Sequence, residues 1–127
     1  MAADLTTGEN TLDASAVRAL VELLGNDQEA LTEIVDALLD EAPQRLAELS
    51  EGANAGDAAL VARAAHTLKA NAAMFGAGPL EGLCRDLEVA ARAGDLSSAA
   101  QPIAAIDAEW LVVRPQLLAL RERGAAQ

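Results

Sequence analysis

The one histidine of the sequence, His66, lies in a segment whose residue types suggest a chemical role. Residues 57–88 read DAALVARAAHTLKANAAMFGAGPLEGLCRDLE, and the apolar spacing in the first half predicts a helix. The apolar face of that helix is formed by Val61, Ala64, Ala65, Leu68 and Ala72. At about 100° per residue, His66 lies about 140° from the centre of this face, so its side chain is expected to point to solvent. A neutral imidazole near pH 7 is a good nitrogen nucleophile.

The side chains expected around His66 are small for an exposed helix face. Such faces usually carry charged and amide side chains, whereas this one carries a single cation, Lys69, three residues after His66. The expected alanine surface consists of Ala59, Ala62, Ala70 and Ala73. No Asp or Glu occurs from Ala58 to Leu80, although the chain has a net charge of −11. The pattern predicts a docking site on which another macromolecule places its active site over His66. The alternative is an incidental surface histidine.

Other site chemistries find little support in the sequence. One histidine and one cysteine, Cys84, give no metal-ligand set and no internal disulfide. The serines lie at predicted caps and turns without a histidine nearby, and no glycine-rich phosphate loop is present. We therefore expect no metal and no cofactor. His66 could still accept a group from a partner that brings the catalytic machinery.

Length and composition predict a single helical domain. The chain has 127 residues, of which 52% are apolar and only 2% aromatic, and alanine and leucine favour helices. The net charge of −11 argues against nucleic acid and against anionic membrane surfaces as partners. The first residues lack the basic and apolar regions of a signal peptide, and no apolar run is long enough to span a membrane. A soluble cytoplasmic protein is expected.

The helix signals predict an all-α antiparallel up-down four-helix bundle over residues 12–123, with a short additional helix at its start. Residues 1–11 are expected to be flexible, and 124–127 to form a tail. Asp13 should cap the short helix, which ends at Gly25, and Asn26 with Glu29 should cap the next one. That second helix contains Pro43, where a kink or short break is expected.

Three further helices complete the expected bundle. The His66 helix should begin after Asp57 and end at Gly76, and the fourth should open with Gly78-Pro79 and close at Gly94. Cys84 lies on its apolar stripe and is expected to be a buried packing residue. The last helix spans about residues 98–123, with a bend expected at Pro115. Its 3-4 apolar seam consists of Ile103, Ile106, Trp110, Val113, Leu117 and Leu120.

Taken together, these motifs resemble the histidine phosphotransfer (HPt) domain. The matching elements are A-A-H-T-L-K around His66, then Phe75-Gly76, L-C-x-x-L-E at residues 83–88, and finally Arg92 and Gly94. The resemblance extends from Leu12 to about Leu120. In that family, an exposed histidine on a four-helix bundle carries a phosphoryl group between receiver-domain aspartates in a multistep phosphorelay.

The resemblance implies roles for individual residues. His66 would be the phosphoryl acceptor, Lys69 would stabilise the phosphoryl oxygens, and Glu88 would hydrogen-bond the imidazole from the neighbouring helix. The protein would be a carrier without enzymatic activity of its own, expected to be a monomer. Receiver domains would be its partners and would supply Mg²⁺. Arg63 and Arg92 would extend the docking surface. The plainer alternatives are ordinary surface charge for both arginines, and for Glu88 a solvated carboxylate paired with Arg85 or Arg92.

The sequence also departs from the family pattern. Ala70 stands where a glycine usually follows the lysine, Asn71 replaces a small Ser or Ala, and Leu38-Leu39 stands where a phenylalanine is common. These changes bear on partner choice and docking. Two other classes stay open. One is a module that docks receivers without carrying phosphate. The other is a histidine-kinase dimerisation domain, although Thr67 stands where that class has an acidic residue and no ATP-binding segment exists.

Overall fold

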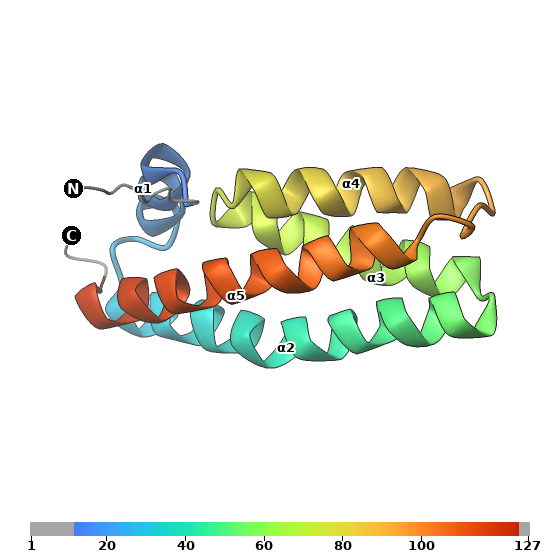
Figure 1. Ribbon diagram of the computed structural model, residues 1–127. Coiled ribbons are helices and arrows are strands. Elements are labelled where there is room, and N and C mark those ends of the chain that lie inside the picture. Colours follow the sequence, from blue (N-terminus) through green and yellow to red (C-terminus); the bar gives the residue numbers. More distant parts are fainter. Residues whose placement is uncertain (1–11, 125–127) are drawn as a thin grey trace, which may run out of the picture.

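The computed structural model describes residues 12–124, which form five helices (Figure 1). Their bounds are α1 Ala14–Leu23, α2 Gln28–Ala55, α3 Ala58–Met74, α4 Gly78–Arg92 and α5 Ala100–Arg123. The predicted flexible segment 1–11 lies outside the described residues, as do residues 125–127 of the predicted tail. The all-α prediction of a four-helix bundle preceded by a short helix is confirmed.

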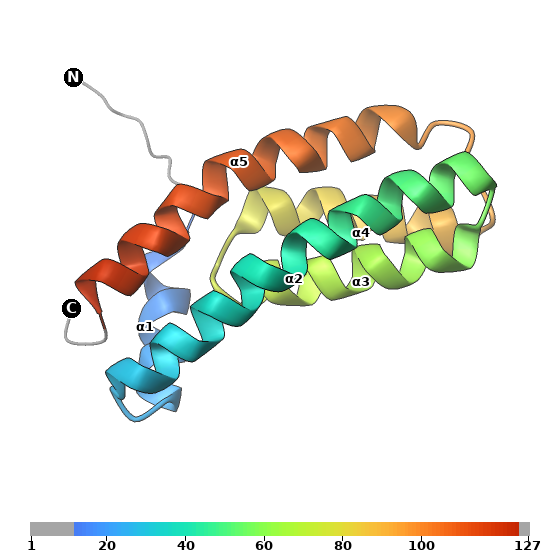
Figure 2. The same ribbon diagram turned by 90° about the horizontal axis from the view of Figure 1, so that it is seen from below.

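Helices α2 to α5 run alternately up and down around one apolar core. Helix α3 packs mainly against α2 and α4, and α5 packs against the same two helices. Figures 1 and 2 accordingly show α3 and α5 at opposite corners of the bundle. The predicted seam of α5, from Ile103 to Leu120, is buried at each of its six positions. This arrangement leaves one outer face on α3 and a second on α5, and the two face away from each other.

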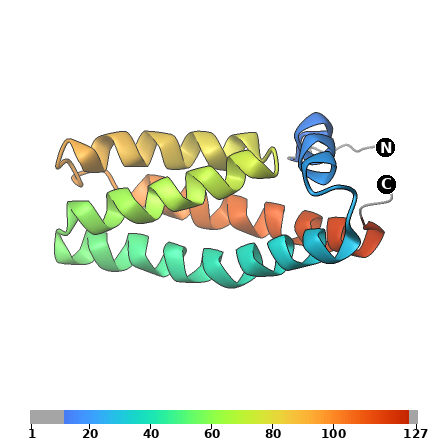
Figure 3. The same ribbon diagram turned by 180° about the vertical axis from the view of Figure 1, so that it is seen from behind.

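Helix α1 closes one end of the bundle, beside the start of α2 and the end of α5 (Figure 3). The backbone N–H of Asp13 donates to the carbonyl of Gly76 at 2.8 Å. Gly76 has a φ of +71°, and a Cβ there would lie 2.9 Å from the Asp13 backbone nitrogen. Glycine is therefore required where α1 meets the turn that follows α3.

Aspartates cap three of the helices, and one of them differs from the prediction. The carboxylates of Asp13 and Asp57 accept backbone N–H groups at the starts of α1 and α3, as expected. Helix α2 is capped by Asp27, which accepts from the N–H groups of Glu29 and Ala30, and the prediction of Asn26 is wrong. Asn26 has a φ of 57°. This left-handed conformation continues the turn after Gly25, so the extended cap conformation falls one residue later.

The prolines interrupt the helices less than expected. Helix α2 runs through Pro43 from Gln28 to Ala55, so the possible break is absent, and α5 likewise runs through Pro115. Pro79 is the second residue of α4, a position in the first turn that needs no N–H donor. Pro102 lies in the first turn of α5. Among residues 12–124, no helix is long and apolar enough to cross a membrane.

Candidate functional site

His66 lies in the middle of α3 and points outward, with 56% of its side chain exposed. The helix that carries it is fixed from both sides, because α3 packs along α2 and along α4. Helix α4 runs antiparallel to it after a short turn, which brings residues near the end of α4 beside the middle of α3. The imidazole is therefore presented to solvent by a helix whose position is set by two neighbours.

Glu88 of α4 is the buried centre of the site, with only 5% of the residue exposed. Its Oε2 lies 3.0 Å from Nδ1 of His66. The same oxygen accepts from Nε of Arg92 at 2.8 Å and lies 2.6 Å from Arg92 Nη2. The other oxygen, Oε1, forms an ion pair with Nζ of Lys69 at 2.8 Å. One carboxylate thus joins the histidine to two cations from different helices.

These contacts keep Glu88 ionised. Burial by itself raises the pKa of a carboxyl group, but the contacts with Lys69, Arg92 and His66 outweigh burial and lower the pKa of Glu88 to about 2. An ionised carboxylate can only accept hydrogen bonds, so the neutral ring of His66 must carry its proton on Nδ1. The lone pair of Nε2 then remains free on the exposed side of the ring.

The structure brings together four of the residues selected from the sequence: His66, Lys69, Glu88 and Arg92. Of the two arginines considered as partners of Glu88, Arg92 forms the ion pair. Arg92 is still 60% exposed along its side chain, so it can bind Glu88 and face a partner at once. Arg63 is exposed on α3 one turn before His66. The expected buried cysteine, Cys84, is fully buried, and burial together with the charge of Glu88 raises the pKa of its thiol to about 12.

The alanine surface needs one correction. Ala59, Ala70 and Ala73 are exposed as expected, but Ala62 is only 6% exposed. A helix that packs against two neighbours buries a wider arc than the single apolar stripe used for the prediction. Ala62 lies at the edge of that arc, in a hollow lined also by Ala91 and Arg92 of α4. We use the name alanine surface below for Ala59, Ala70 and Ala73 alone.

The absence of acids in the sequence of α3 does not extend to its surroundings in space. Asn71 of α3 donates from Nδ2 to Oε1 of Glu41 at 3.0 Å. Glu41 belongs to α2 and is 42% exposed along its side chain. Sequence reasoning missed this acid, because the spacing of residues within one helix does not show which side chains a neighbouring helix places beside it.

No group of three or more histidine, cysteine or acidic side chains is close enough to hold a metal ion within residues 12–124. What the arrangement offers is an oriented nucleophile. His66 shares the carboxylate of Glu88 with two cations, Lys69 and Arg92, whose positive charge can attract incoming negative charge.

Comparisons with known proteins identify relatives of the whole bundle. The model of the Hpt domain family matches residues 33–122, a range that includes all four residues of the site. The crystal structure of histidine-containing phosphotransfer protein B (HptB) from Pseudomonas aeruginosa PAO1 is similar, with a TM-score of 0.81 and 29% sequence identity. The similarity covers 90% of this chain and 96% of that chain. No curated protein matches the sequence.

Proposed function

This chain belongs to the Hpt domain family and serves in histidine phosphotransfer within phosphorelays, and we propose that His66 is the residue that carries the phosphoryl group. The observation that supports this assignment is the hydrogen bond between Nδ1 of His66 and the buried carboxylate of Glu88, at 3.0 Å. It leaves Nε2 as the exposed nucleophilic atom of the one histidine in the chain.

The proposed reaction is a direct displacement at phosphorus. The lone pair of Nε2 forms the N–P bond while the bond between phosphorus and the aspartyl oxygen of a receiver breaks. The electron pair of the broken bond stays on the receiver's aspartate as a carboxylate. Nδ1 keeps its proton, so the phosphorylated ring becomes positively charged, and the charge of Glu88 balances it. Transfer to the next receiver runs through the same steps in reverse.

Lys69 and Arg92 have different roles in this proposal. Lys69 is bound to Oε1 of Glu88, the oxygen that does not contact the imidazole. Its flexible ammonium group can move to the phosphoryl oxygens without releasing His66. Arg92 holds Oε2, the oxygen that orients the ring. We infer that Arg92 keeps Glu88 in place and ionised when Lys69 turns to the phosphoryl group.

The partner surface is proposed to surround His66. Hpt proteins interact with receiver domains, and the exposed alanine surface would let the receiver's active-site loops approach closely, with Arg63 at its edge. The receiver would bring the acidic residues and the Mg²⁺ that the transfer of a phosphoryl group requires. This chain would therefore act as a carrier in the cytoplasm, with its catalytic machinery supplied by the partner.

The test is phosphotransfer from a panel of phosphorylated receiver domains, followed by mass-spectrometric mapping of acid-labile phosphate. The intact chain should be labelled on His66, and the His66→Gln variant should lose all labelling while keeping its helical circular dichroism. Labelling that survives in His66→Gln would refute the assignment. Receiver binding and signalling that persist in His66→Gln would instead favour a docking module that carries no phosphate.

A further inference from the structure

Helix α5 carries two seams with the same 3-4 spacing, and the bundle uses only one of them. The inner seam, from Ile103 to Leu120, is buried in the core. The outer seam consists of Gln101, Ala104, Ala108, Leu111, Pro115, Leu118 and Glu122. At its centre, Leu111 is 71% exposed, and the adjacent Val112 is 47% exposed. Large apolar side chains at the middle of an outward-facing seam, with polar residues at its ends, are typical of a helix that pairs with another helix.

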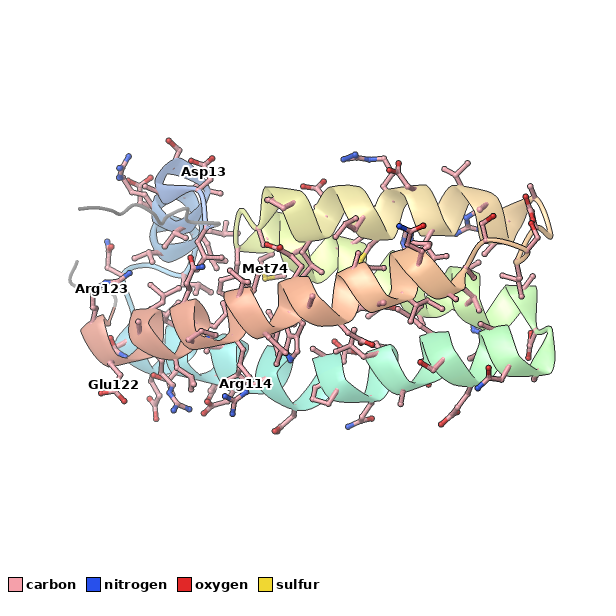
Figure 4. The ribbon with its side chains drawn as sticks, in the orientation of Figure 1. Asp13, Met74, Arg114, Glu122 and Arg123 are labelled. Atoms are coloured by element: carbon pink, nitrogen blue, oxygen red, sulfur yellow. The ribbon has the colours of Figure 1, made fainter. Side chains whose placement is uncertain are left out.

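The edge of the outer seam carries charges of opposite sign, seven residues apart. Asp107 and Arg114 lie on the side of α5 that faces α2, where Asp107 borders a hollow with Ala53 and Asn54 of that helix. Figure 4 shows Arg114 on the same side. Arg121, the next charge along this edge, is paired with Asp36 of α2. Asp107 and Arg114 form no ion pair among residues 12–124.

We propose that the outer seam of α5 binds the same seam of a second copy of this chain, with the two helices antiparallel. In that orientation, Leu111 of each copy packs against Ala108 of the other, and Pro115 packs against Ala104, so large side chains meet small ones. Asp107 and Arg114 lie on one edge on either side of the centre. An antiparallel pair therefore places Asp107 of each copy beside Arg114 of the other. A parallel pair would place this edge of the two copies on opposite sides of the contact, so Asp107 and Arg114 could not pair across it.

The pairing leaves the phosphotransfer site free. Helix α5 lies at the corner of the bundle opposite α3 (Figures 1 and 2), so a dimer formed through α5 presents each His66 on an outer side. The inference does not depend on the function proposed for His66. It replaces the monomer expected from the sequence with a dimer that exposes two copies of His66.

The dimer is expected to be weak. The apolar part of the seam, from Ala104 to Leu118, is about 21 Å long at 1.5 Å per residue. Pro115 also removes one backbone hydrogen bond on this face, which bends helices away from the proline and shortens the contact. An interface of one helix pair falls at the small end of specific interfaces. We expect a dissociation constant on the order of 100 µM.

Sedimentation velocity of the full chain between about 5 µM and 1 mM tests the dimer. The sedimentation coefficient should rise toward that of a dimer, and Leu111→Glu should abolish the rise. Leu23→Glu is the matched control, because Leu23 on α1 is 83% exposed and the substitution adds the same charge elsewhere. A chain that stays monomeric up to 1 mM, or an equal effect of both substitutions, would overturn the proposal. Circular dichroism checks that both variants are folded.

Charge reversal tests the antiparallel orientation separately. Asp107→Arg alone and Arg114→Asp alone should each weaken dimerisation about 3- to 10-fold, because each places like charges together in both pairs between the copies. The double variant should restore it to within about twofold. Additive weakening in the double variant would contradict the antiparallel arrangement. Dimers that form while Leu111→Glu has no effect would show that another surface is used.

Discussion

The outer faces of α3 and α5 differ in where their charges are balanced. At the α3 face, Lys69 of α3 and Arg92 of α4 both meet the buried carboxylate of Glu88 inside the same chain. On α5, Asp107 and Arg114 flank exposed apolar side chains and find no ion-pair partner in the described part of the chain. The α3 face is thus organised before any partner arrives. On the α5 face, the apolar side chains are buried and the two charges are paired only when a second helix covers them.

The different roles proposed for the two faces also account for the side chains that each carries. A phosphoryl carrier must let a receiver's active site approach its histidine, and small neighbours such as Ala70 and Ala73 allow this. A helix that pairs with another helix needs large apolar groups, and Leu111 provides one. In the complexes proposed above, the α3 face would gain affinity mainly from contacts between the phosphoryl group and the receiver's active site. The α5 face would gain it from burial of apolar area.

The largest expected effect concerns Ala62, which is buried against α4 and was expected to be exposed. Ala62→Glu should lower the free energy of unfolding by about 2–3 kcal/mol, because it forces a carboxylate against α4. Ala73→Glu, at an exposed position on the same helix, should change it by less than about 0.5 kcal/mol while still weakening receiver binding through repulsion of the receiver's acids. Urea unfolding curves measure both values. Equal stabilities of the two variants would contradict the burial of Ala62.

The next effect concerns the orientation of the imidazole. Glu88→Ala should slow phosphotransfer about 10- to 30-fold while changing receiver affinity less than about threefold, because the ring keeps its exposure but loses its fixed tautomer. Nitrogen-15 chemical shifts of His66 should show the proton on Nδ1 in the parent and a mixture of tautomers in the variant. Leu111→Glu is the control and should leave both measurements unchanged. A Glu88→Ala protein with the parental transfer rate would refute the role of Glu88.

The elements of the fold could be read from the sequence because they depend on local patterns. The 3-4 spacing of α5 and the aspartates before α1 and α3 each act within a few residues along the chain. The errors arose where geometry depends on another element or on an unusual backbone. Ala62 is buried by α4, and Asn71 meets Glu41 of α2. The cap of α2 moved from Asn26 to Asp27 because the preceding turn uses a left-handed residue.

The same distinction applies to the site. The residue types and the resemblance selected His66, Lys69, Glu88 and Arg92, but they did not show that one carboxylate contacts all three others. That arrangement depends on the rotation of α4 relative to α3. The sequence of α4 allows Glu88 to pair with Arg85 or Arg92 equally well by spacing. Packing against α3 decides in favour of Arg92.

The last expected effect is a difference in acid stability, which distinguishes the α3 face from the rest of the surface. The pKa of Glu88 in the folded chain, about 2, lies below the ordinary value of 4.5. The carboxylate therefore stabilises the fold fully above about pH 4.5, and this contribution is lost as the pH falls through 2. Glu88→Gln keeps the shape of the side chain but has no such charge. Its stability should fall less steeply than that of the parent chain between pH 5 and pH 2.

Urea midpoints of the two proteins, measured in half-unit steps across this window, give the comparison directly. Other carboxylates titrate in both proteins alike, so the difference between the two curves isolates Glu88. The difference in urea midpoint between the parent chain and Glu88→Gln should be largest at pH 5. It should shrink toward pH 2, because a protonated Glu88 no longer attracts Lys69 and Arg92. A difference in urea midpoint that does not change with pH would mean that shape and packing, and not the charge of Glu88, hold the two cations. The charge-balanced face of α3 would then differ from that of α5 in packing alone.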